Sequence, residues 1–248
     1  MFAIYKKELR SYFANAVGYV YLGVFLAISA LLCCYTTLGM GTYDTSLYFT
    51  IIPFIFIIII PLLTMKIFAE EKKLRTEQLL LTAPISITKM VLGKFLAAFT
   101  LFFGGLLLSL LNFIPLCVYA NIDGLNKAFS GSVVGPIPAM IFSNALGLML
   151  LGAAFIAIGM FISSLTENQL AAAIITVVVI TTMLILDLVN GFINNYIIRF
   201  ILSWVSFSTR FSMFQTGLFD PSALLYFVST CGVFLFLTVR IYDKRRWN

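Results

Sequence analysis

Six long apolar runs, separated by short connectors that carry most of the charge, constrain the fold of this chain more than any other feature. A bilayer core about 30 Å thick is crossed by roughly 20 apolar residues in a helix. Runs of that length predict spans at Val17–Leu38, Tyr48–Phe68, Met90–Ala120, Pro136–Ile162, Leu170–Asn190 and Ala223–Tyr242. With 61% hydrophobic and only 10% charged residues, the chain has too little polar surface for a soluble globule. We therefore expect an integral membrane protein.

The apolar runs are typical of helices rather than of barrel strands. Segments such as Ile51–Leu63 and Ala171–Leu186 are apolar on every face, whereas an outer-membrane strand alternates polar and apolar residues over about ten positions. The predicted fold is thus an all-α integral membrane protein with six transmembrane helices. Because almost no residues remain outside the spans and their connectors, we expect one transmembrane domain covering residues 1–248.

The basic residues predict the orientation of the bundle. Of the 16 Lys and Arg residues, all but Lys127, Arg199 and Arg210 precede the first span, surround the connector between spans two and three, or close the chain. Cytoplasmic loops carry an excess of Lys and Arg, so both termini are expected in the cytoplasm. An even number of spans agrees with that orientation. Topology then explains the net charge of +6, and no nucleic-acid partner is expected.

Residues 1–16 predict an amphipathic helix that lies in the membrane interface. Aromatic and aliphatic side chains fall on one side of the helix, and basic side chains fall on the other. The first set is Phe2, Tyr5, Leu9, Tyr12 and Phe13, and the second set is Lys6, Lys7 and Arg10. The alternative is a lead-in that turns directly into the first span.

Residues 69–89 form the main connector on the predicted cytoplasmic side. It begins with the charged run Glu70–Arg75, after which Thr76 is placed to cap a short helix that contains Leu79–Leu81. Ala83-Pro84 interrupts that helix. A charged run by itself is most often a solvated face. Exposed leucines beside the membrane favour a docking element for another protein.

Two further segments predict how helices pack. Residues 191–220 are too long and too aromatic for a simple turn, so we expect one or two helices at the outer membrane interface, with Trp204 among the headgroups. Span four carries small residues four positions apart, a spacing that lets another helix approach closely. These residues are Ala153, Ala157, Gly159 and Ser163. The approaching helix belongs either to the same chain or to a second copy.

The chain lacks the sequence features of an enzyme and of a self-powered transporter. It has no Gly-x-x-x-x-Gly-Lys-Ser/Thr phosphate loop, and its one Gly-Lys pair, Gly93-Lys94, opens an apolar run. Histidine is absent, the four cysteines lie in predicted spans without ligand-like spacing, and no nucleophile stands beside a base. Acids deep in the spans, which an ion-coupled carrier would use, are missing as well. We expect no catalytic, cofactor or metal site, and a partner would supply the energy for transport.

Four stretches of the sequence carry a family resemblance. The most specific is Glu70-Glu71-Lys72-Lys73-Leu74-Arg75-Thr76-Glu77-Gln78-Leu79-Leu80-Leu81-Thr82-Ala83-Pro84-Ile85-Ser86, followed by Gly93-Lys94-Phe95. The others are Lys7-Glu8-Leu9 with Tyr12-Phe13, Phe211-x-x-Phe214-x-x-Gly217-x-x-Asp220, and Arg245-Arg246-Trp247. Together they resemble the ABC type-2 exporter permeases, close to the branch for gliding motility and nitrous-oxide-reductase maturation. The resemblance covers nearly the whole chain.

The resemblance implies an N-terminal elbow helix, six spans, a dimer of identical or paralogous permeases, and a cytoplasmic coupling helix that fits a groove on a separate ABC ATPase. It places the coupling role on Thr76, Glu77, Leu79, Leu80 and Leu81, and the elbow role on Lys6, Lys7, Glu8 and Leu9. The ATPase dimer would bind Mg-ATP, and this chain would lie in the inner membrane of a prokaryote. Where the family commonly has Gly-Thr-Leu-Glu, this chain has Arg75-Thr76-Glu77-Gln78, which offsets the acid by one position.

The leading hypothesis is therefore a permease that forms the translocation path of an ATP-driven exporter. Two alternatives stay open, namely a membrane anchor or force-transmitting subunit that transports nothing, and an ion-coupled carrier. The spans offer aromatic and aliphatic surface without buried charge, which is compatible with lipid-like, peptide or drug cargo. An additional extracytoplasmic or membrane subunit at residues 191–220 is compatible with the same hypothesis.

Overall fold

The computed structural model describes residues 1–14, 16–40, 44–76, 78, 86–118, 138–191, 193, 196–216 and 220–247. Every regular element in this part of the chain is helical. The elements are α1 (Phe2–Ala14), α2 (Val17–Cys33), η1 (Cys34–Leu38), α3 (Ser46–Thr64), α4 (Lys66–Lys73), α6 (Ile87–Leu110), α8 (Pro138–Leu165), α9 (Gln169–Asn190), α10 (Tyr196–Val205), α11 (Phe207–Gln215) and α12 (Pro221–Trp247). The π-helical turn η1 directly continues α2.

Six helical segments within the described residues are long and apolar enough to cross a bilayer, and they confirm the six predicted spans. They are Val17–Thr37, Ser46–Lys73, Ile87–Val118, Met140–Leu165, Gln169–Asp187 and Pro221–Arg246. Helices are suited to this environment because each backbone polar group in hydrocarbon finds its partner within its own segment. The second segment is 28 residues long and gathers its charges in α4, so we infer that α4 extends past the hydrocarbon core.

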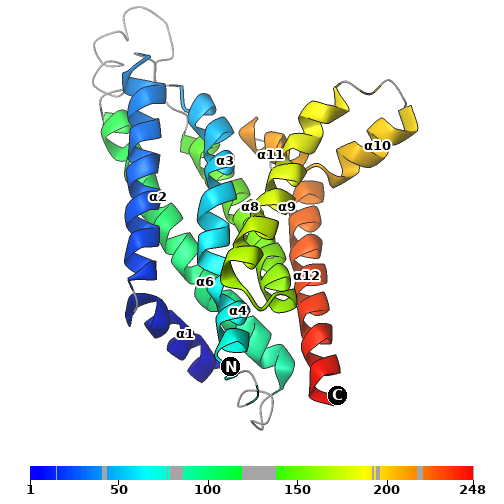
Figure 1. Cartoon of the computed structure of the whole chain (residues 1–248). Helices are drawn as coiled ribbons and strands as arrows, with labels where there is room; N and C mark the ends of the chain where they lie inside the picture. Colours follow the sequence, from blue (N-terminus) through cyan, green and yellow to red (C-terminus); the bar gives the residue numbers. More distant parts are fainter. Residues whose placement is uncertain are drawn as a thin grey trace, which may run out of the picture.

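Figure 1 shows a helical bundle whose two termini lie at the same end, here called the termini end. α8 lies at the centre and contacts α3, α6, α9, α11 and α12. Accordingly, 72% of its most apolar stretch is buried, compared with 17% for α12. α1 lies at the N-terminal end of α2 and packs against α6. The position of the termini agrees with an even number of spans.

Glycines allow neighbouring helices to approach the backbone of α8 closely. A Cβ atom on Gly152 would lie 2.1 Å from Phe102 Cζ of α6, and a Cβ atom on Gly159 would lie 2.4 Å from Thr64 Oγ1 of α3. A larger residue at either position would force the neighbouring side chain or its helix to shift, because real Cβ atoms almost never make contacts under 3.0 Å. The predicted close approach at Gly159 is therefore confirmed as a contact between helices of the same chain.

Two helices follow α9, as expected for this segment, but their environments differ. α10 exposes Phe200 and Trp204, the latter by 56%, in agreement with an interfacial position. α11 instead buries Phe207, Phe211 and Phe214 and packs against α8 and α9. These three rings recur at intervals of four and three residues, which places them on one face of a helix. The aromatic residues of α11 thus contribute to the core rather than to an interfacial surface.

Candidate functional site

The helix α4 leads from the second span into the predicted coupling connector. α3 ends at Thr64 and α4 begins two residues later, with Met65 between them in helical geometry (φ −57°, ψ −30°). α4 continues to Lys73, and α6 begins at Ile87. The connector predicted at residues 69–89 is therefore shorter than expected, because its first five residues are helical and its last three belong to α6.

α4 ends in a Schellman motif centred on Arg75. The backbone φ of Arg75 is 55°, in the left-handed region that a non-glycine residue enters at a cost of about 1–2 kcal/mol. The N–H groups of Arg75 and Thr76 donate to the carbonyls of Lys72 and Glu71, both at 3.0 Å. At the position of Arg75 the permeases that this chain resembles commonly have glycine, which adopts a positive φ without strain. The motif thus sets the direction in which the connector leaves α4.

A buried lysine at the termini end joins α4 to α1 and α6. Lys94, on α6, is only 2% exposed. Its Nζ lies 3.1 Å from Glu8 Oε1 on α1 and 2.7 Å from Glu71 Oε1 on α4. Nζ also donates to the Ile67 carbonyl at 3.0 Å and lies 5.2 Å from the centroid of the Phe68 ring. We call these five residues the Lys94 cluster.

In the Lys94 cluster, the buried ammonium group has an acceptor for each of its hydrogen-bond donors. A lysine ammonium has three donors and no acceptor, and the three contacts with Glu8, Glu71 and the Ile67 carbonyl match those donors in number. The two carboxylates keep small exposed areas, 15% for Glu8 and 16% for Glu71, so both still reach solvent. A buried ion pair offsets its desolvation cost only when such further hydrogen bonds are made. Removal of Lys94 would therefore leave two carboxylates in the bundle without their cation.

A serine on α8 stabilises the joint between α3 and α4. Ser163 Oγ accepts hydrogen bonds from the backbone N–H groups of Phe68 and Ala69, both at 3.2 Å, and it donates to the Met65 carbonyl at 3.3 Å. A side chain that enters the backbone ladder in this way interrupts a helix at a defined point. Contact with α8 therefore holds the interruption at Met65 in place.

The last turn of α8 also contacts α4 and α12. The Ser164 carbonyl accepts hydrogen bonds from Lys72 Nζ on α4 and, at 3.1 Å, from Arg245 Nη2 on α12. The final carbonyls of a helix lack intrahelical partners and attract cations, so both contacts stabilise this end of α8. Beside them, the ring centroids of Phe68 and Tyr242 are 4.9 Å apart. Through α4, the connector is thus linked to α1, α6, α8 and α12.

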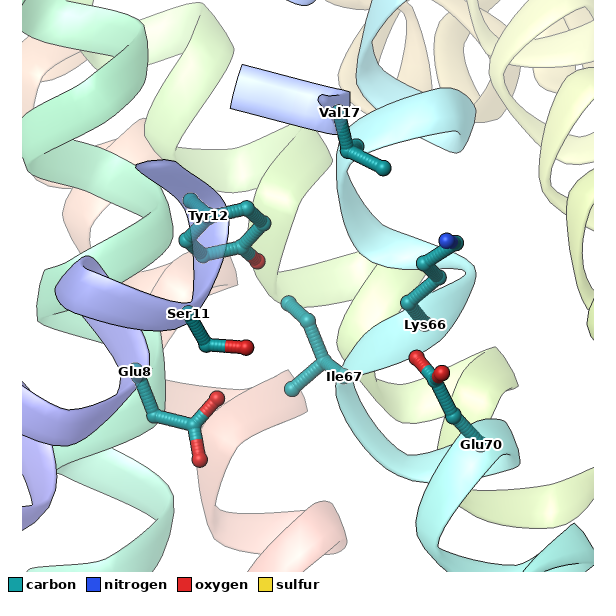
Figure 2. Close-up of a pocket in the computed structure, with 7 residues that line it drawn as sticks. All are labelled: Glu8, Ser11, Tyr12, Val17, Lys66, Ile67 and Glu70. Atoms are coloured by element: carbon teal, nitrogen blue, oxygen red, sulfur yellow. The ribbon is translucent and has the colours of Figure 1, made fainter. Parts of the chain in front are cut away.

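α1 makes a further contact with the end of α3. The buried Tyr12 hydroxyl donates to the Leu63 carbonyl at 3.2 Å, and burial raises the pKa of Tyr12, so this group stays a neutral donor. Figure 2 shows side chains of α1 and α4 that face each other across a cavity of about 50 Å³. The cavity is lined by Glu8, Ser11, Tyr12, Val17, Lys66, Ile67 and Glu70. A space of this size holds a water molecule or two, so it is too small for a transported substrate.

The predicted coupling residues lie mostly outside the described residues. Glu77, Leu79, Leu80 and Leu81 belong to that group, so their role stays a prediction. Thr76 is described, and it is exposed just past the end of α4. Its hydroxyl donates at 3.3 Å to a carbonyl in the last turn of α4. Thr76 therefore contacts the end of α4. Its predicted capping of the next helix stays a prediction.

The predicted elbow residues all lie on α1, which is helical as expected. Lys6 and Lys7 are exposed, and Leu9 is partly buried. Glu8 alone points into the bundle, where it contacts Lys94. The four residues thus have different environments, and only Glu8 connects α1 to the Lys94 cluster by an ion pair.

Lys94 corrects two expectations from the sequence. By its place in the sequence it belongs with the basic residues around the connector, and the spans are predicted to lack buried charge, whereas Lys94 is almost fully buried in α6. α6 begins at Ile87, so Lys94 lies about two turns inside the helix. The sequence did contain one signal of a buried charge: Lys94 is the single charged residue within the predicted apolar span Met90–Ala120, and such a residue is generally paired or functional. Its partners could not be identified from that signal alone.

Ser163→Ala should loosen the joint between α3 and α4. The substitution deprives two buried backbone N–H groups of their acceptor, which costs about 1–3 kcal/mol. The midpoint of thermal denaturation of the purified chain in detergent should fall by roughly 2–10 °C. Ser164→Ala is the matched control, because the Ser164 hydroxyl donates to the Phe161 carbonyl in its own helix. Equal losses in the two variants would show that Ser163 has no particular part in the joint.

Comparison with known protein families places the chain in a family. The family described as ABC-2 family transporter protein matches residues 2–247. The match therefore extends from the start of α1 to the end of α12 and is not confined to the apolar segments. The comparison with curated proteins finds no match.

Proposed function

Because the chain belongs to the ABC-2 family of transporter proteins, we propose that it is the membrane-spanning permease subunit of an ATP-driven exporter. The six apolar helices in the described part of the chain make it a multi-pass membrane protein. The sequence contains no phosphate-binding loop, so a separate ABC ATPase would supply the energy. The observation that carries the proposal is the Lys94 cluster, which fastens the helix leading into the connector to α1 and α6.

The proposed orientation places the termini end in the cytoplasm of a prokaryotic cell. Both termini lie at this end (Figure 1), and the basic residues of the first and last helices gather with them. An excess of Lys and Arg marks the cytoplasmic side of inner-membrane proteins. α4 also lies at this end, so a cytoplasmic ATPase would reach the connector that follows it.

The proposed coupling starts at the connector between α4 and α6. Closure of two ATPase subunits on ATP would displace the connector, and α4 would move with it because the two are continuous. Lys94 would pass the displacement to α6 and, through Glu8, to α1. Ser163 would pass it to α8 at the centre of the bundle. Close-packed helices transmit such movements as nearly rigid bodies, and this rearrangement would open the path.

The proposed assembly contains two permeases and two ATPase subunits. A second copy of this chain or a paralogue would complete the translocation path, and the ATPase subunits would bind Mg-ATP. The glycines Gly152 and Gly159 of α8 already contact α6 and α3 within one chain. The contact between permeases would therefore use other helices, whose apolar side chains are exposed in a single chain.

The first test is to isolate the chain from its native membrane in a mild detergent and identify what accompanies it by mass spectrometry. A stoichiometric ABC ATPase is the expected partner. Recovery of the chain alone, under conditions that keep other ABC complexes intact, would contradict the permease assignment.

A second test separates transport from anchoring. The complete complex is reconstituted in vesicles and supplied with ATP against a panel of lipids, peptides and drugs. Movement of a compound that requires ATP and survives an ionophore is expected for an exporter. Loss of transport with the ionophore alone would indicate an ion-coupled carrier, and ATP hydrolysis without movement of any compound would favour a membrane anchor.

A further inference from the structure

α1 turns one narrow face toward the bundle. Ile4, Glu8 and Tyr12 recur at intervals of four residues and therefore share this face. Ile4 and Tyr12 are buried, and Glu8 contacts Lys94. Phe2 and Phe13 lie on another face and are 75% and 39% exposed. α1 therefore keeps aromatic surface that the bundle does not cover.

A third face of α1 is basic. Lys6, Lys7 and Arg10 are exposed, and with Ala3, Ser11 and Ala14 they line a shallow, open groove on the surface of α1 alone. Lys7 Nζ lies 3.8 Å from Glu8 Oε1, whereas Lys94 approaches the same oxygen to 3.1 Å. Because Glu8 is engaged more closely by Lys94 and Lys7 is exposed, the Lys7 ammonium is available to another anion. The groove therefore presents three cations to any anion at this face.

An apolar groove adjoins the basic one. It has a volume of about 420 Å³ and lies between α1 and α6. Its lining consists of Met1, Phe2, Tyr5, Leu96 and Thr100. Because Phe2 and Lys6 are four positions apart, they are neighbours on the surface of α1, and the two grooves meet there.

α1 lies beside the beginning of the first span. It ends at Ala14, and the span begins at Val17. Tyr19 and Val20, in the first turn of that span, are exposed as expected for side chains that face lipid. An amphipathic helix in this position lies at the depth of the headgroups, where phosphate and acyl chain are both within reach.

We propose that α1 and α6 form a binding site for an anionic phospholipid. The lipid phosphate lies among Lys6, Lys7 and Arg10, and an acyl chain follows the groove between α1 and α6. Cationic side chains attract anionic headgroups, and the apolar lining removes acyl surface from water. Because α1 also supplies Glu8 to the Lys94 cluster, a bound lipid holds α1 against α6 and stabilises the folded chain.

A lipid accounts for more of this surface than an acidic protein segment does. An acidic segment would match the basic groove but not the apolar groove or the exposed ring of Phe2. A phospholipid carries both chemistries in one molecule and is present wherever a membrane span begins. The adjoining grooves therefore favour a lipid.

The test compares two lipids that differ in headgroup charge but not in acyl chains. The purified full-length chain is mixed in detergent with dioleoyl-phosphatidylglycerol or dioleoyl-phosphatidylcholine at equal concentrations, and bound lipid is counted by native mass spectrometry. Each basic residue near an anionic surface contributes about fivefold to binding, so we expect more than about tenfold preference for phosphatidylglycerol. Only that lipid should raise the midpoint of thermal denaturation. Equal binding of the two lipids would overturn the proposal.

Two variants locate the site. Lys6→Gln/Lys7→Gln/Arg10→Gln should lose most of the preference, whereas Arg240→Gln/Lys244→Gln/Arg246→Gln should retain it. The control removes the same charge from exposed residues of α12 at the same end of the bundle. If both variants lost the preference for phosphatidylglycerol, or if neither lost it, a site on α1 would be excluded.

Soluble glycerol 3-phosphate distinguishes a lipid from a free anion. It carries the phosphate without acyl chains, so it should not displace phosphatidylglycerol at equal concentration. Displacement would show that the apolar groove takes no part, and the site would then be one for free phosphates. None of these measurements needs an ATPase, so their outcome is independent of the proposed function.

Discussion

Lys94→Met should leave the purified chain much less stable. The substitution deprives Glu8 and Glu71 of their buried cation, and the loss of one partner from a buried ion pair costs about 3–5 kcal/mol. In a chain of this size, that loss lowers the midpoint of thermal denaturation by roughly 10 °C. The midpoint can be measured as the temperature at which half of the monodisperse protein in detergent is lost. If the chain acts as proposed, ATP-dependent transport should fall as well.

Two comparisons make this result specific to the Lys94 cluster. Lys89→Met is the matched control, because Lys89 is exposed on the same helix and should shift the midpoint by less than about 2 °C. Adding Glu8→Gln and Glu71→Gln to Lys94→Met removes the unpaired charges and should restore part of the lost stability. Equal midpoints for Lys94→Met and Lys89→Met would contradict the assignment, as would a triple variant no better than the single one.

The spans were predictable because the bilayer itself imposes their length and composition. The predicted span Val17–Leu38 coincides with α2 and η1, and Leu170–Asn190 differs from α9 by one residue. Both segments are apolar on every side over the length that a bilayer requires. Neither prediction depends on which helix packs against which, so the sequence alone was sufficient.

The Lys94 cluster depends on packing and could not be predicted in the same way. Lys94 contacts Glu8, which is 86 residues away in the sequence, and Glu71, which is 23 residues away. Hydrophobic periodicity reports which residues share a face of one helix, not which helices meet. Periodicity placed Glu8 on the N-terminal helix and the resemblance gave it an elbow role, but neither indicated its partner. Its role in the bundle became visible only through the packing of α1 on α6.

The beginning of the connector shows a second limit of the sequence. The sequence placed the charged run from Glu70 to Lys73 in the connector at residues 69–89, whereas the structure continues α4 to Lys73 and buries Ala69 completely. A charged run is compatible with either state, because a helix with buried partners such as Lys94 and Ser164 accommodates the same residues. Local composition therefore could not distinguish the two states.

Leu80→Asp/Leu81→Asp should release the ATPase from the permease. If the coupling helix fits a groove on the ATPase, these leucines would be buried there, and each buried anchor in an interface contributes about 2 kcal/mol or more. Two aspartates should therefore weaken the complex by at least about 100-fold. The ratio of ATPase to tagged chain after isolation in mild detergent measures this effect. ATP-dependent transport in vesicles should be lost in parallel, while the membrane domain remains folded.

Two variants of the same connector test whether the loss comes from the coupling helix. Leu80→Ile/Leu81→Ile keeps the apolar surface and should retain the ATPase. Leu74→Asp introduces the same charge at a leucine that is 64% exposed just past α4, outside the predicted coupling residues Thr76–Leu81, and should have a smaller effect. An intact and active complex with both aspartates would refute the coupling assignment. Equal loss with Leu74→Asp would instead place the contact over the whole connector, because charge at either position would then exclude the ATPase.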